Sequence, residues 1–113
     1  MKTLMDRVAD AKTRIKEISI EQFNSNAFSN YTVIDVREPK EHMDSRIPNS
    51  INIPMGGLEF EILKHCETNG VDTKIVLYCR SGGRSALAAE TLLDLGFSNT
   101  VSLAGGINAW QSA

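Results

Sequence analysis

Four short apolar runs, separated by helix-forming segments, constrain the fold of this chain more than any other feature. The runs read "YTVIDV", "SINIP", "KIVLY" and "TVSL", and they are rich in the β-branched residues that favour strands. Between them lie segments with helical patterning or composition, such as "GLEFEILKHC" and "RSALAAETLLDLG". Strands that alternate with helices predict an α/β fold, in which a central parallel sheet carries helices on both faces.

The start of the chain has its own pattern. Apolar residues from Leu4 to Ile18 recur at spacings of four and three, which predicts an amphipathic helix that packs on the rest of the protein. The end of this helix is open, because "RIKEIS" also fits a short edge strand. In that case Ser19 and Gln22 would form a capping box that begins a new helix.

Length, charge and hydropathy limit the possible partners. A chain of 113 residues with 42% hydrophobic residues has the size of one domain that buries its own core. A formal charge of -2 gives no basic surface, so we expect no nucleic-acid partner. Asp6 and Arg7 interrupt the place where a signal peptide would be apolar, and no apolar run reaches the length of a bilayer span. We therefore expect a cytoplasmic protein without a membrane partner.

The cysteines and histidines give no sign of a metal site or a cofactor. Cys66 and Cys79 are too few for a disulfide framework and lack the paired spacing of zinc ligands. His42 and His65 stand among polar neighbours, so we expect both to be exposed. Cys66 shares a predicted helical face with apolar residues, which favours a buried position over a second reactive thiol.

Residues 79–85, "CRSGGRS", follow the strand "KIVLY" directly. In open parallel sheets, ligands bind at the carboxyl ends of the strands, where loops lead into helix N-termini. Backbone N–H groups and the helix dipole should therefore converge on the sulfur of Cys79. Arg80 and Arg84 add permanent charge, and no acidic residue lies between Cys79 and Gly83 to oppose it. Such surroundings lower a cysteine pKa below about 8.5, so the loop predicts a reactive thiolate in an anion-binding cradle.

Four segments in order make the chain similar to a rhodanese-like sulfurtransferase domain. They are "VIDVRE", "IPNSINIP", "CRSGGRS" and "LAGGINAW", and the resemblance extends from Ser19 to residue 113. It implies a rhodanese-like fold over residues 19–113, preceded by an N-terminal helical extension over residues 1–18. Among the departures from the family pattern Gly-His-Ile-Pro-Gly-Ala, two concern the histidine and the second glycine. Arg46 replaces the histidine, and Asn49, a turn residue able to adopt positive φ, replaces the second glycine.

The resemblance implies a thiosulfate sulfurtransferase that works through a persulfide on Cys79 and needs no cofactor. The donor would be a small sulfane-sulfur compound such as thiosulfate, and the acceptor a thiol, including a protein thiol, or cyanide. Asp35 corresponds to a family aspartate expected to hydrogen-bond the loop or its arginine, and Arg37 is expected to pair with Glu38 or Glu41. The donor and the persulfide would be held by the loop residues Arg80, Ser81, Gly82, Gly83, Arg84 and Ser85.

Two rival functions come from other classes. Cysteine phosphatases resemble this fold, but they place five residues between cysteine and arginine, whereas four lie between Cys79 and Arg84. A non-catalytic interaction module often lacks the cysteine, which this chain keeps, although a sulfur carrier with little turnover stays open. We expect substrate specificity to lie around residues 55–59. Trp110 is expected to anchor the terminal helix rather than to stack on a substrate.

Overall fold

The computed structural model of the protein describes residues 2–66 and 68–113, and this part of the chain contains one five-stranded parallel sheet. The strand order is β1-β5-β4-β2-β3. All four strand pairs are parallel. The predicted α/β fold is therefore confirmed. The strands are β1 (Lys16–Ile18), β2 (Thr32–Asp35), β3 (Ile51–Asn52), β4 (Ile75–Tyr78) and β5 (Thr100–Leu103).

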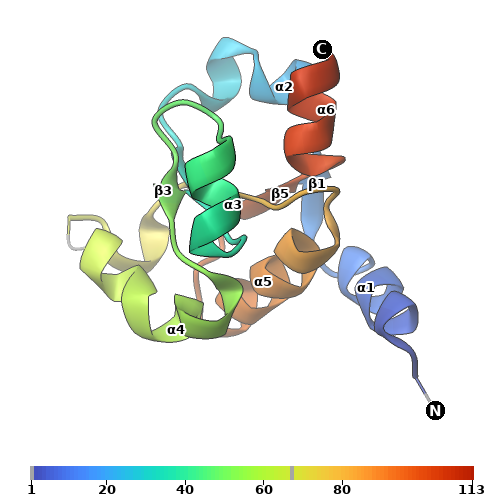
Figure 1. The fold of residues 1–113 in the computed structure, drawn as a ribbon. Coiled ribbons are helices and arrows are strands. Elements are labelled where there is room, and N and C mark those ends of the chain that lie inside the picture. Colours follow the sequence, from blue (N-terminus) through green and yellow to red (C-terminus); the bar gives the residue numbers. More distant parts are fainter. Residues whose placement is uncertain (1, 67) are drawn as a thin grey trace.

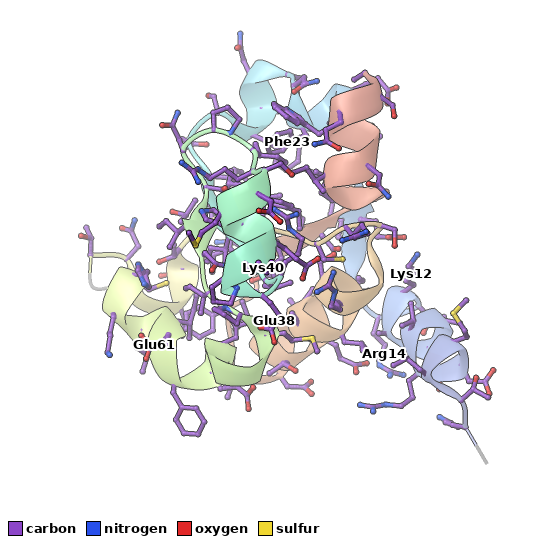
Figure 2. The ribbon with its side chains drawn as sticks, in the orientation of Figure 1. Lys12, Arg14, Phe23, Glu38, Lys40 and Glu61 are labelled. Carbon is purple, nitrogen blue, oxygen red and sulfur yellow. The ribbon has the colours of Figure 1, made fainter. Side chains whose placement is uncertain are left out.

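Helices cover both faces of the sheet, as the alternating pattern predicted (Figure 1). One core cluster joins the sheet to α4 and α5, and a second joins it to α2 and α6. In Figure 2, Phe23 at the end of α2 lies close to α6, and it packs on the second cluster together with Trp110. The helices are α1 (Leu4–Lys12), α2 (Ile20–Phe23), α3 (Pro39–Asp44), α4 (Leu58–Glu61), α5 (Gly83–Asp94) and α6 (Gly106–Ser112).

Several short 3-10 turns complete the connections. They lie at Asn26–Phe28, Met55–Gly57, Ile62–His65 and Gly70–Asp72. The predicted helix over "GLEFEILKHC" is thus short and continues as a 3-10 turn, but its expected inner face is confirmed, because Leu58, Ile62 and Cys66 are all buried in one core cluster.

The open question about the N-terminus is answered in favour of the edge strand. The helix α1 ends at Lys12, and residues 16–18 form β1, which pairs with β5 at the edge of the sheet. Ser19 and Gln22 form the expected capping box at the start of α2. A helix and a strand in place of one longer helix let the chain contribute to the sheet and also lay α1 beside α5 (Figure 1).

The strand order decides which loops meet. The strand β4 lies between β5 and β2, and all four of its residues are buried. Because the strands are parallel, the segments that follow β2 and β4 leave the sheet at the same edge. The residues after Asp35 and those after Tyr78 are therefore neighbours in space, although about forty positions separate them in the chain.

Candidate active site

Cys79 follows β4 directly and is only 1% exposed. Its side chain lines a pocket of about 430 Å³ that is shared by the loop after β4, the start of α5, and α1. The helix α5 begins at Gly83, after Gly82 has turned the chain with a φ of 106°. Only glycine adopts such a backbone without strain, so the glycine pair lets the loop close tightly around the sulfur.

The sulfur of Cys79 is surrounded by hydrogen-bond donors. It accepts from the N–H of Gly82 at 3.1 Å and from the N–H of Ser85 at 3.4 Å, and the Ser85 hydroxyl oxygen lies 3.6 Å away. Burial raises the pKa of the Cys79 thiol, but hydrogen bonds from the Ser85 hydroxyl and from the N–H groups of Ser85, Gly82 and Ser81 outweigh it, so the pKa is lowered. The predicted anion cradle is present.

A second hydroxyl lies behind Ser85. The side-chain oxygens of Ser85 and Ser102 are 2.8 Å apart, and both residues are fully buried. When Ser85 donates to the thiolate, its oxygen is free to accept the Ser102 proton, so Ser102 holds the donor in that orientation. Sequence reasoning missed Ser102, because β5 and the loop after β4 meet only in the folded sheet.

The backbone of the loop is held from behind by α6. The N–H of Ile107 donates to the carbonyl oxygen of Cys79 at 2.9 Å, and the N–H of Asn108 donates to that of Arg80 at 3.1 Å. These are first-turn N–H groups, which have no partner within their own helix. The segment "LAGGINAW" therefore supports the loop, with Gly106 at the point of closest approach.

The arginines of the loop are not free of acidic partners. Arg84 donates two hydrogen bonds to the carboxylate of Glu41, at 2.8 and 3.0 Å, and Arg80 donates a longer one at 3.4 Å. Arg84 lowers the pKa of Glu41 to about 2, so the carboxylate is charged at neutral pH. No acidic residue lies between Cys79 and Gly83, but α3 brings Glu41 to the loop arginines from the neighbouring strand end. Hydrogen bonds, rather than unopposed arginine charge, stabilise the thiolate.

The expected partners of Asp35 and Arg37 are wrong. Arg37 is 3% exposed and does not reach Glu38 or Glu41; it donates to Asp35 at 2.7 to 3.1 Å. Asp35 does not bond the loop: it accepts from Arg37 and lies 2.9 Å from Nδ1 of His42. Burial raises the pKa of Asp35, but the hydrogen bonds from Arg37 outweigh it and lower the pKa.

This buried cluster holds α3 in place. Arg37 also donates to the carbonyl oxygen of Ser45 at 2.5 Å, which ties both ends of the segment around α3 together. His42 is therefore half-buried and hydrogen-bonded, not exposed as expected. Glu41 lies on α3. Asp35 and Arg37 therefore act on the loop arginines only indirectly, by holding this helix in place.

The other residues singled out from the sequence lie only partly where we expected them. Residues 55–59 do not line the pocket that contains Cys79; residues of α1 do. Cys66 is buried and His65 is exposed, as expected. Asn49 adopts a φ of 67°, which confirms its turn conformation. Among residues 2–66 and 68–113, no cluster of His, Cys, Asp and Glu side chains has the makings of a metal site, and no helix is long and apolar enough to cross a membrane.

The acidity of Cys79 leads to a direct prediction. In a Cys66→Ala background, we expect alkylation of Cys79 by iodoacetamide to increase with pH through an inflection below the ordinary value of about 8.5. The folded protein lowers the thiol pKa, so the thiolate persists to lower pH than in the unfolded chain, and its stabilisation is lost as pH falls through the folded pKa. The rate is measured by intact mass across a pH series.

The control is the same variant unfolded in urea, whose inflection should return to about 8.5. An inflection of the folded protein at or above that of the unfolded chain contradicts the hydrogen-bond cradle. So does a folded protein in which Cys79 does not react at all, because the thiol would then be closed to the pocket.

The chain is similar in sequence and in fold to known proteins. The family model described as "Rhodanese-like domain" matches residues 19–113. A putative sulfurtransferase, YtwF, of Bacillus subtilis is 37% identical over 99 residues, which cover 86% of this chain and 91% of that protein. Other curated relatives are longer: the chain spans 23% of the length of one and 51% of another.

Two solved structures are also similar. The human single-domain sulfurtransferase TSTD1 has a TM-score of 0.74 at 25% identity, with 85% of this chain and 95% of that chain covered. A Rhodopseudomonas palustris protein of unknown function, described as a possible tyrosine phosphatase, has a TM-score of 0.82 at 28% identity. It covers 99% of this chain, and the match includes 91% of its own length.

Proposed function

Because this chain belongs to the rhodanese-like domain family, we propose that it is a sulfurtransferase that uses Cys79 to move a sulfane sulfur from thiosulfate to a thiol or cyanide. One observation carries the proposal: the buried Cys79 sulfur accepts two backbone N–H groups at the beginning of a twelve-residue helix. Donors fixed at that point stabilise an anionic sulfur without reorganisation.

The first half-reaction is an attack of the Cys79 thiolate on the outer sulfur of thiosulfate. The new bond joins that sulfur to the cysteine sulfur while the bond inside thiosulfate breaks, and sulfite leaves with the electron pair. Thiosulfate brings two negative charges and sulfite removes two, so the net charge of the site does not change. The single negative charge of the thiolate moves to the terminal sulfur of the persulfide. The loop N–H groups then face an anionic terminal sulfur about 2.05 Å from the cysteine sulfur.

The second half-reaction regenerates the thiolate. An acceptor thiolate or cyanide attacks the terminal sulfur, the bond to the cysteine sulfur breaks, and Cys79 leaves as a thiolate. Its lowered pKa makes it a good leaving group. Arg84, half-exposed beside the loop, supplies a guanidinium for the donor oxygens, with its charge partly balanced by Glu41.

Free thiols are typical of proteins in a reducing compartment, and both Cys66 and Cys79 are free. We therefore propose that the protein acts in the cytoplasm.

A phosphatase is the second candidate, because one structurally similar protein is described as a possible tyrosine phosphatase. The loop argues against it here. Only four residues, 80–83, separate Cys79 from Arg84, and a phosphoryl group needs a wider ring of donors than a single sulfur.

The test is the intact mass of the protein after incubation with thiosulfate, followed by turnover with cyanide. We expect one added sulfur atom per chain, repeated turnover, and no measurable hydrolysis of an aryl phosphate. An adduct without repeated turnover would identify a sulfur carrier. An unmodified mass contradicts the proposal, and hydrolysis of the phosphate ester would favour the phosphatase.

A further inference from the structure

One wall of the pocket around Cys79 comes from α1, outside the part of the chain that the family model matches. Leu4, Met5 and Val8 of α1 face Leu87 of α5 across the pocket, and Lys12 lies at the other end of the helix. We call Leu4, Met5 and Val8 the α1 wall. A volume of about 430 Å³ lies within the range of about 300 to 1,000 Å³ typical of sites for organic ligands, and far exceeds what thiosulfate or cyanide needs.

The helix that carries this wall is anchored at its far end. Ala11 is completely buried, and just beyond α1 the guanidinium of Arg14 forms an ion pair with Glu90 of α5. Figure 2 places Lys12 and Arg14 where α1 approaches α5. Val8 lies close to the start of α5, since a Cβ added to Gly83 would be 3.8 Å from its Cγ2. The wall is therefore held in position next to the active-site loop.

The other end of α1 exposes apolar surface. Leu4 is 65% exposed and Met5 is 76% exposed, although both line the pocket that contains the reactive sulfur. Exposed apolar side chains beside a functional cleft mark a surface that a ligand covers. Neither side chain can bind a dianionic donor, so the α1 wall has no use in the first half-reaction.

We propose that the α1 wall selects the acceptor, and that the acceptor is a low-molecular-weight organic thiol with an apolar group next to its sulfur; this rests on the proposed sulfur transfer. The thiolate attacks the terminal sulfur of the Cys79 persulfide, the bond to Cys79 breaks, and an organic persulfide leaves. The apolar group lies against Leu4, Met5 and Leu87 during this step. The volume of about 430 Å³ matches a small organic ligand, so the acceptor in this proposal is a free thiol.

The experiment compares two capped tripeptides, glycine-cysteine-glycine and leucine-cysteine-leucine, as acceptors for protein preloaded with thiosulfate. Their thiols are chemically alike, so the ratio of their second-order rate constants reports the apolar contact. The unmodified protein should prefer the leucine peptide. In the double variant Leu4→Ala/Met5→Ala, this ratio should fall about ten-fold, since lost methylenes in an apolar site have effects of this size. Both residues are exposed, so the variant should fold.

The matched control is Met43→Ala on α3, because Met43 is 78% exposed but does not line the pocket. Its ratio should equal that of the unmodified protein. An unchanged ratio in the double variant contradicts the role of the α1 wall in selecting the acceptor. Persulfide loading by thiosulfate would still support sulfur transfer. If the leucine tripeptide reacts only when fused to a carrier protein, the acceptor is a protein thiol and the proposal is also wrong. Absence of loading overturns both proposals.

Discussion

Replacing Cys79 by serine should abolish both persulfide formation and sulfur transfer, with a loss of at least about 10³-fold in rate. Serine keeps the shape of the side chain, but its hydroxyl is not ionised near neutral pH and forms no persulfide. The loop itself should survive, because the N–H groups of Gly82 and Ser85 can donate to the serine oxygen as they do to the sulfur. Intact mass after thiosulfate treatment and the rate of thiocyanate formation measure the two steps separately.

Cys66→Ala is the control for this result. Cys66 is a free cysteine buried in the core and does not line the pocket that contains Cys79, so its replacement should lower stability modestly and leave the sulfur adduct in place. If the adduct persists in Cys79→Ser but disappears in Cys66→Ala, the nucleophile has been assigned to the wrong thiol. The urea unfolding curves of both variants show whether each is folded under the conditions of the assay.

The second large effect concerns Gly106, where α6 meets the active-site loop. A Cβ at this position would overlap the carbonyl oxygen of Cys79 and lie 2.6 Å from that of Arg80, and both are backbone atoms that cannot turn aside. The backbone φ of Gly106 is also positive, at 56°. We expect Gly106→Ala to lower the free energy of unfolding by about 2 to 5 kcal/mol, from positive-φ strain of about 1 to 2 kcal/mol plus overpacking of about 1 to 3 kcal/mol. It should also slow persulfide loading.

Gly70 provides a matched control for this prediction. It has the same φ of 56°, but a Cβ there would meet nothing within 4 Å, so Gly70→Ala tests the strain of the backbone alone. Its cost should be about 1 to 2 kcal/mol, with normal persulfide loading. If both variants lose the same free energy of unfolding in urea, α6 can shift to make room for the added methyl group. In that case α6 does not hold the loop rigidly.

The local parts of the site could be predicted from the sequence. A strand, a cysteine and a glycine-containing turn into a helix occupy consecutive residues, so short-range sterics and the helix N-terminus place the sulfur next to the N–H groups. The same holds for Asn49, whose short polar side chain tolerates the positive φ that the turn requires. Such features depend on neighbours a few positions away, which the sequence shows directly.

Contacts between residues far apart in the chain could not be predicted from the sequence. Glu41 pairs with Arg84 across forty-three positions, and this pair depends on β2 lying beside β4. Alternating strands and helices predict a parallel sheet without giving its strand order, so the carboxylate that balances the loop arginine could not be identified. The ion pair between Asp35 and Arg37 was missed for another reason. Burial of Arg37 excludes water and leaves Asp35 as its partner, whereas an exposed arginine could have reached Glu38.

The amino-acid sequence by itself determined the α/β class, the family resemblance, the candidate cysteine and the turn that presents it. Tertiary structure alone decided that Glu41 balances Arg84 and Arg80, that Ser102 stands behind Ser85, and that α1 forms a wall of the pocket. The physical reason is the range of the forces involved. Local conformation follows from steric and hydrogen-bonding preferences within a few residues, whereas these contacts exist only after hydrophobic burial has fixed the order of the strands and the side of the sheet on which each helix packs.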